Sequence, residues 1–123
     1  MKKVVVIDDD IQCNQLVCMI LKHAGYEVRS ANNGAEGLKM IMQERPDLVI
    51  TDLYMPEKDG LEMIMELRQT ERKIKILAIS GGALNIDRAD TLDAAEMFGA
   101  DAIMAKPFNV ETFLNKVKEL LAE

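Results

Sequence analysis

Acidic residues directly follow two apolar runs of this chain, at positions where a charge is costly to bury. Asp8 and Asp9 come after the run Val4–Ile7. Asp52 comes after the run Leu48–Thr51, which has the composition of a strand buried on both faces. Clustered carboxylates can hold a hard cation, and one of them can act as a nucleophile. We therefore expect these acids to face a site and not the core.

Two further reactive side chains follow later apolar runs. Ser80 comes directly after Ile74–Ile79, and Lys106 comes directly after Ala102–Ala105. Three carboxylates close together repel one another unless a cation lies among them, and oxygen ligands with room for water suit Mg²⁺. Such an ion would let Asp52 attack an anionic phosphoryl group, with Lys106 as a second positive charge and the Ser80 hydroxyl near a phosphoryl oxygen. The product would be an aspartyl phosphate.

These side chains can meet only if the strands that carry them run parallel. Short β-branched runs alternate with helical patterns along the chain, which predicts an α/β fold with a parallel sheet and helices on both faces. Right-handed crossovers bring the carboxyl ends of such strands to one edge, where ligands bind. The expected strands are Val4–Ile7, Glu27–Ser30, Leu48–Thr51, Ile74–Ile79 and Ala102–Ala105.

Capping and stop signals predict helices between these strands. The expected helices run from Asp10 to Gly25, from Asn33 to just before Pro46, from Asp59 onward, from about residues 87–90 to Gly99, and from Asn109 onward. The helical period places one apolar face on the first of them, made of Leu16, Val17, Ile20, Leu21 and Ala24.

Length and composition are those of one ordinary globular domain. The chain has 123 residues, of which 49% are hydrophobic and 29% charged, and its net charge is −6. The acidic balance argues against direct nucleic-acid binding, and no apolar run approaches the roughly 20 residues that span a membrane. Cys13 and Cys18 are five apart on one expected helix and cannot easily form a disulfide, so we expect reduced thiols and a cytoplasmic protein.

Taken together, these motifs resemble the receiver (CheY-like) domain of two-component response regulators. The resemblance covers the whole chain and rests on VVVIDDD, VITDLYMPEKDG, ILAISGG and AKPF, in this order. It implies a flavodoxin-like (βα)5 fold with a doubly wound five-stranded parallel sheet of order 2-1-3-4-5. We expect a single receiver domain over residues 1–123 with no output domain, because nothing follows the last helix.

The resemblance also implies a phosphoryl-transfer site. Asp52 matches the phosphoacceptor, and Ser80 and Lys106 match the hydroxyl residue and the lysine of its pocket. A cis peptide between Lys106 and Pro107 is implied as well. The donor would be a phosphohistidine on a sensor histidine kinase or a histidine phosphotransfer protein, and phosphorylation would switch binding to a downstream protein target. The domain would catalyse its own phosphorylation and dephosphorylation without being a multi-turnover metabolic enzyme.

Four positions match the Mg²⁺ site of the family. Asp9 matches the direct acidic ligand, Asp8 the acid that supports the metal, often through water, and Asp52 the phosphoacceptor that shares it. Tyr54 matches the position whose backbone carbonyl binds the metal. The cofactor implied by the resemblance is therefore Mg²⁺.

Two features depart from the family pattern. Many receivers carry an aromatic switch residue three positions before the lysine, where this chain has Ile103, so the usual aromatic switch cannot operate. The segment from Ser80 to Lys106 is also longer than in compact receivers, by roughly four residues, with the extra length assigned to GGALNIDRAD. We expect a modified partner surface there.

Three alternatives remain at this point. A pseudo-receiver would be an interaction module that works without phosphorylation. A haloacid-dehalogenase-like phosphohydrolase uses similar groups, but Asp8–Gln12 does not complete its D-x-D-x-[TV] pattern. A flavodoxin would need a phosphate loop after the first strand, which is missing from the sequence. We expect a monomer or weak dimer that contacts neither nucleic acid nor membrane.

Overall fold

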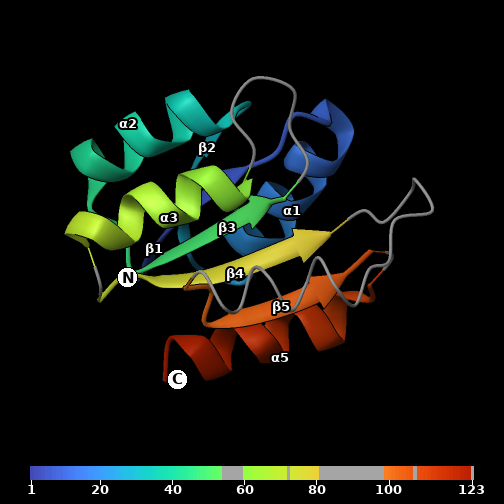
Figure 1. Ribbon diagram of the computed structural model, residues 1–123. Coiled ribbons are helices and arrows are strands. Elements are labelled where there is room, and N and C mark those ends of the chain that lie inside the picture. Colours follow the sequence, from blue (N-terminus) through green and yellow to red (C-terminus); the bar gives the residue numbers. More distant parts are fainter. Residues whose placement is uncertain (54–59, 72, 81–98, 107, 123) are drawn as a thin grey trace.

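The computed structural model describes residues 1–53, 60–71, 73–80, 99–106 and 108–122. In these ranges, five parallel strands form one sheet in the order β2-β1-β3-β4-β5, which confirms the predicted order (Figure 1). None of the helices described is long and apolar enough to cross a membrane. In chain order the elements are β1 (Lys3–Ile7), α1 (Ile11–His23), β2 (Glu27–Ala31), α2 (Gly34–Glu44), β3 (Leu48–Asp52), α3 (Gly60–Thr70), β4 (Lys75–Ser80), β5 (Ala102–Ala105) and α5 (Val110–Leu120).

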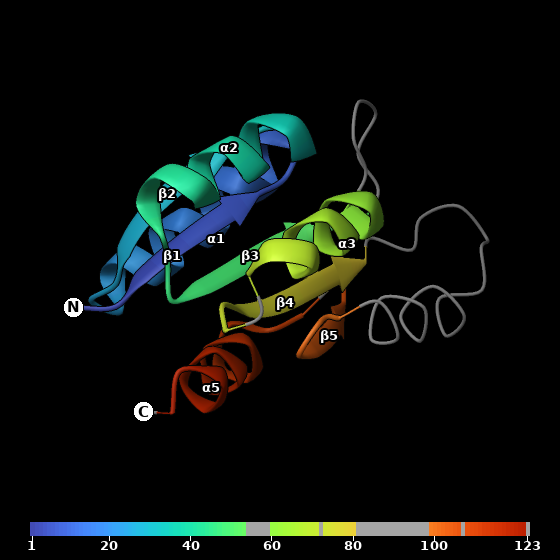
Figure 2. The same cartoon turned by 60° about the vertical axis from the view of Figure 1, so that its left-hand side comes forward.

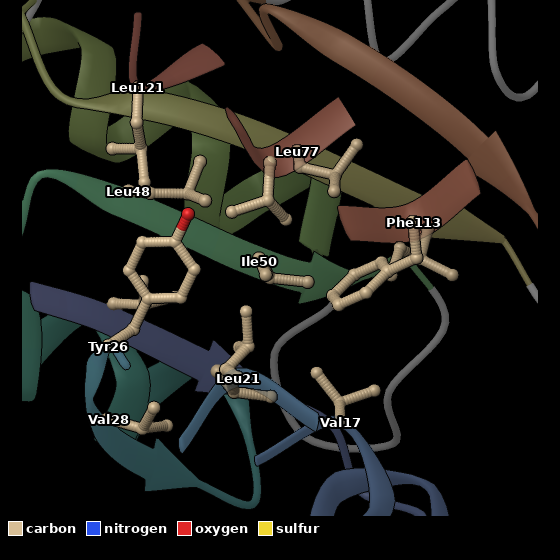
Figure 3. Packing of buried hydrophobic residues seen from close by; sticks show 13 residues of the cluster. Val17, Leu21, Tyr26, Val28, Leu48, Ile50, Leu77, Phe113 and Leu121 are labelled. Atoms are coloured by element: carbon tan, nitrogen blue, oxygen red, sulfur yellow. The ribbon is translucent and has the colours of Figure 1, made fainter. Parts of the chain in front are cut away.

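Helices cover both faces of the sheet, and successive residues of a central strand face opposite layers. Val5 packs in a cluster that includes Met63 of α3, whereas its neighbour Val4 packs with Val17 of α1 and Phe113 of α5. Figures 1 and 2 show α2 and α3 on one face and α1 and α5 on the other, and Figure 3 shows the packing of the second cluster. Burial on both faces explains why the central strands are apolar runs without alternation.

The described helix ends follow the predicted signals. Asp10 Oδ1 accepts hydrogen bonds from two backbone N–H groups in the first turn of α1, at 3.0 and 3.2 Å. Asn33 and Asn109 cap α2 and α5 in the same way, at 2.8 and 2.7 Å. Gly25 follows α1 with φ of 99°, in the left-handed region that favours glycine. These caps confirm the predicted starts of α1, α2 and α5.

The predicted apolar face of α1 is wrong at two positions. Leu16 is 51% exposed and Ala24 is exposed, whereas Val17 and Leu21 are buried. The buried positions of α1 are 14, 17 and 21, so the polar Asn14 completes the stripe that the sequence analysis had extended to Leu16. The fourth predicted helix and the long segment before it lie outside the described residues.

The start of α3 lies close against the end of β3. The backbone N–H of Gly60 donates a hydrogen bond to the carbonyl oxygen of Leu53 at 3.1 Å. A Cβ at position 60 would overlap the carbonyl oxygen of Asp52 and lie 2.9 Å from the Cα of Leu53. Backbone atoms cannot turn aside as a flexible side chain can, so this close approach requires glycine. Gly60 therefore sets how closely α3 lies to the last residue of β3.

Gly60→Ala is expected to lower the free energy of unfolding by about 1–3 kcal/mol, the usual cost of forcing an extra carbon into a packed site. Urea denaturation of the variant and the parent measures the difference. Met65→Ala, at an exposed position of the same helix, is the control and should change stability by less than about 0.5 kcal/mol. Equal stability of Gly60→Ala and the parent would contradict the close contact.

Candidate functional site

The acids predicted from the sequence meet at the carboxyl end of the sheet. Asp8 and Asp9 follow β1, and Asp52 is the last residue of β3, which pairs with β1. Each acid offers one carboxylate oxygen, and these three oxygens lie within 4.8 Å of one another. Asp8 and Asp52 are only 5% and 8% exposed, whereas Asp9 is exposed. The cluster of carboxylates is therefore formed, with two of its members buried.

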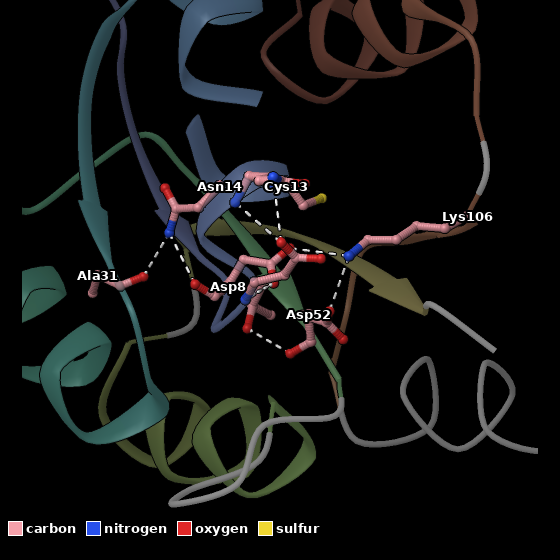
Figure 4. A network of polar contacts seen from close by, with 9 residues as sticks. Asp8, Cys13, Asn14, Ala31, Asp52 and Lys106 are labelled. Carbon is pink, nitrogen blue, oxygen red and sulfur yellow. Dashed lines mark hydrogen bonds and ion pairs between the residues drawn. The ribbon is translucent and has the colours of Figure 1, made fainter. Parts of the chain in front are cut away.

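Lys106 extends its ammonium group between the two buried acids (Figure 4). Its Nζ lies 3.0 Å from Asp8 Oδ2 and 3.1 Å from Asp52 Oδ2, and its side chain is 21% exposed. Burial alone would lower the pKa of Lys106, but the charge of Asp52 and the hydrogen bond and charge of Asp8 outweigh burial and raise the pKa. Lys106 is therefore a permanent cation that pairs with both carboxylates. The position of Lys106 in the pocket was predicted from the sequence, whereas its bond to Asp8 was not.

Asp8 is held by backbone and side-chain groups on several sides. The backbone N–H of Asp10 donates to Asp8 Oδ1 at 2.9 Å, and Asn14 Nδ2 donates to the carbonyl oxygen of Asp8 at 3.0 Å. The same amide nitrogen donates to the carbonyl oxygen of Ala31 at 2.9 Å, at the end of β2 (Figure 4). Asn14 is not among the residues predicted from the sequence. Its signal was a polar residue three positions before Val17, in the buried stripe of α1.

Cys13 lies beside the acid cluster, and Cys18 lies one turn further along α1. Both thiols are free, as predicted. Burial, and then a hydrogen bond with Asp8, raise the pKa of the Cys13 thiol to about 11 against an opposing effect of Lys106. Burial also raises the pKa of Cys18. Both residues are therefore protonated near neutral pH and are packing residues, not thiolate nucleophiles.

β5 carries Lys106 to the site and is fixed at both of its ends. At the carboxyl end, Ala105 pairs with Ser80, the last residue of β4. At the opposite end, Arg68 of α3 forms an ion pair with Asp101 at 2.7 Å, just before β5 begins. Lys106 therefore leaves the sheet next to the end of β4 and reaches past that strand to Asp52 on β3.

The remaining predictions concern Ser80, Tyr54, Pro107 and Ile103. Ser80 ends β4, as predicted, and its backbone lies at the same edge of the sheet as Asp52. Tyr54 and Pro107 lie outside the described residues, so the metal-binding role of Tyr54 and the cis peptide stay predictions. Ile103 lies on β5, half-buried against the cluster formed with α2 and α3. An aliphatic residue therefore occupies the place of the expected aromatic switch.

The set of ligand atoms fits a hard divalent cation. The acids Asp8, Asp9 and Asp52 bring three negative charges and Lys106 one positive charge, which leaves a formal charge of −2. Carboxylate oxygens with access to water are the ligands that Mg²⁺ takes in proteins. The exposure of Asp9 gives the cluster that access. The residues present are therefore suited to Mg²⁺ in both charge and donor type.

Sequence comparison relates the chain to response regulators. The family model described as response regulator receiver domain matches residues 4–118. Response regulator MprA of Mycobacterium leprae is 35% identical over 119 residues, which cover 97% of this chain and 50% of that protein. The DNA-binding dual master transcriptional regulator RpaA of a Synechocystis species is 36% identical over 98% of this chain and 49% of that protein. The chain spans about half the length of the curated relatives it matches.

Solved structures agree with this relationship over nearly the whole chain. The chemotaxis protein CheY4 of Vibrio cholerae is 31% identical with a TM-score of 0.87, covering 98% of both chains. A CheY-like receiver domain protein of Methanospirillum hungatei is 29% identical with a TM-score of 0.90, covering 99% of this chain and 94% of that one. The predicted flavodoxin-like receiver fold is confirmed.

Replacing Lys106 by methionine should lower the free energy of unfolding by about 1–3 kcal/mol, because two buried carboxylates lose a shared hydrogen-bonding partner. Folding raises the pKa of Lys106 above its ordinary value of 10.5. The stabilisation of the folded state by the ammonium is therefore complete below pH 10.5 and is lost only as the pH rises past the pKa of the folded state. The decrease in the free energy of unfolding caused by Lys106→Met should therefore be the same at about pH 7 and about pH 9.

Urea denaturation at both pH values, without divalent cations, measures this effect. Lys116→Met is the matched control, because Lys116 pairs only with Glu119 among the described residues, at 3.3 Å, and Glu119 is exposed. That change should alter stability by less than about 0.5 kcal/mol. A Lys106→Met protein as stable as the parent would contradict the bridging role of the ammonium.

Proposed function

Because the chain belongs to the response regulator receiver domain family, we propose that it is a Mg²⁺-dependent phosphoacceptor whose Asp52 takes a phosphoryl group from a phosphohistidine. The observation that carries the proposal is the pairing of Asp52 Oδ2 with Lys106 Nζ at 3.1 Å within a cluster of three carboxylates. A buried carboxylate nucleophile beside a cation can receive an anionic group that a carboxylate without a neighbouring cation would repel.

The reaction exchanges one bond for another. The carboxylate of Asp52 attacks phosphorus, and a P–O bond forms while the P–N bond to the donor imidazole breaks. The ring nitrogen keeps the bonding electron pair and takes up a proton from solvent. Lys106 lies within reach to balance the negative charge on the phosphoryl oxygens, and we assign the Ser80 hydroxyl to one of these oxygens. Most of the rate gain then comes from positioning and charge neutralisation.

Asp8, Asp9 and Asp52 would hold the Mg²⁺, together with the backbone carbonyl of Tyr54. When bound, the ion supplies positive charge that lowers the repulsion between the carboxylates and the incoming phosphoryl group. Asp8 and Asp52 are already positioned to bind the ion. Lys106 pairs with both carboxylates, and the N–H of Asp10 orients the carboxylate of Asp8. Hydrolysis of the aspartyl phosphate by water returns the Asp52 carboxylate and releases phosphate, so the domain resets itself.

The partners in this proposal are proteins. The donor is a sensor histidine kinase or a histidine phosphotransfer protein, and the phosphorylated domain binds a downstream protein target. We assign no DNA contact to this domain, because its net charge is −6. The DNA binding named for RpaA belongs to a relative about twice as long.

A second candidate function is a pseudo-receiver that acts without phosphorylation. Ile103, in place of the expected aromatic switch, favours this candidate. The formed cluster of Asp8, Asp9, Asp52 and Lys106 favours the phosphoacceptor, because an interaction scaffold has no need to bury two like charges. The phosphoacceptor therefore remains the better-supported function.

Incubation with acetyl phosphate and Mg²⁺, followed by intact mass measurement, tests the proposal. We expect the parent to gain one phosphoryl group and Asp52→Asn to gain none, since the amide removes the nucleophile. Chelation of Mg²⁺ should abolish the gain in the parent. A gain in both proteins would place the nucleophile elsewhere, and the lack of any gain, with beryllofluoride also failing to bind, would favour the pseudo-receiver.

A further inference from the structure

Asn14 has no part in the chemistry proposed above, yet it is a polar residue buried beside the site. It lies on α1 and is only 4% exposed. Its Nδ2 donates two hydrogen bonds, to the carbonyl oxygen of Asp8 at 3.0 Å and to that of Ala31 at 2.9 Å. Its Oδ1 accepts from the thiol of Cys18 at 3.4 Å. Two carbonyl groups around Nδ2 fix the orientation of the amide, because only its NH₂ group can donate to them.

The Asn14 amide acts where the ladder between β1 and β2 ends. The backbone N–H of Asp8 donates to Ala31 at 3.2 Å, and Ala31 is the last residue of β2. Asp8 follows β1, so its carbonyl group lies one residue beyond the last pair of the ladder, Ile7 and Ala31. Asn14 provides the donor that a further strand residue would otherwise have supplied. A side chain thus extends the ladder to the residue whose carboxylate belongs to the acid cluster.

The contacts of Asp8 divide into two groups. Its N–H bonds to Ala31 of β2, its carbonyl oxygen to Asn14 of α1, and its Oδ1 to the N–H of Asp10, the N-cap of α1. Its Oδ2 is the atom that meets Lys106. A cation that took the place of the ammonium at Oδ2 would therefore leave the other three contacts in place. The carboxylate would keep its orientation through the exchange.

We infer that Asn14 is a positioning residue for the divalent-cation site, which fixes the Asp8 main chain so that Oδ2 is aimed at the ion. This inference rests on the proposed function, because it concerns the metal that the phosphoacceptor needs. Groups that orient metal ligands through hydrogen bonds typically affect metal affinity by about 10- to 100-fold. Asn14 orients Asp8 through a hydrogen bond to its backbone carbonyl oxygen and not through a bond to its carboxylate.

Mn²⁺ binding measured by electron paramagnetic resonance of the free ion tests the inference without any phosphoryl transfer. Asn14→Leu keeps the size of the side chain but removes both donors, and it should weaken Mn²⁺ binding about 10-fold or more. Cys18→Ala is the matched control, because it removes the contact to Oδ1 and leaves both Nδ2 bonds. Its Mn²⁺ affinity should equal that of the parent. Urea denaturation without metal reports separately on stability.

The outcomes separate the inference from the proposed function. A folded Asn14→Leu protein that binds Mn²⁺ as tightly as the parent, with only its stability reduced, would show a merely structural residue and overturn the inference alone. Lack of Mn²⁺ binding in the parent would overturn the proposed metal site and the inference with it. If Asn14→Leu does not fold, Asn14→Ser, which keeps one hydroxyl donor on a smaller side chain, should bind Mn²⁺ several-fold more weakly than the parent, and unchanged binding would again overturn the inference.

Discussion

The burial of two like charges at the ends of neighbouring strands is the constraint on which this site depends. Asp8 and Asp52 cannot both be ionised and shielded from water without a cation close by. Lys106 provides that cation from a position 98 residues after Asp8 and 54 residues after Asp52. The fold must therefore bring the carboxyl ends of β1, β3 and β5 to one place. A parallel sheet does so, because all its strands end at the same edge.

The strand order sets the distance that the lysine must cross. β3 and β5 are separated by β4, so a side chain from the end of β5 has to pass the end of β4 before it meets Asp52. A long, flexible lysine can do this while its charged end reaches both acids. The same order places β1 beside β3, so the two acids are neighbours without any long side chain between them. The two hydrophobic layers, which hold alternate residues of each strand, fix this arrangement from both faces of the sheet.

Sequence patterns predicted the strands and the residues at their carboxyl ends, since burial on two faces and capping leave strong local signals, whereas the strand order followed from the resemblance to receiver domains. Sequence patterns did not predict which of those residues bond to one another. Lys106 was expected to meet a phosphoryl group, but its bond to Asp8 follows from a side-chain conformation that no local pattern encodes. Asn14 was missed because a polar residue in an apolar stripe does not reveal its acceptors. Leu16 was misplaced because the helical period allows an error of one residue when several neighbours are apolar.

The raised pKa of Lys106 has a consequence for how the site can change state. The raised pKa keeps the Lys106 ammonium charged at neutral pH, so loss of its own proton does not release it from Asp8 and Asp52. Another positive charge placed among the carboxylates would compete with the ammonium for them. Lys106 is therefore a fixed positive charge at neutral pH, and its pairing with the two carboxylates responds to other charges that enter the cluster. This balance of charge arises from the same buried acids that make the cluster costly to form.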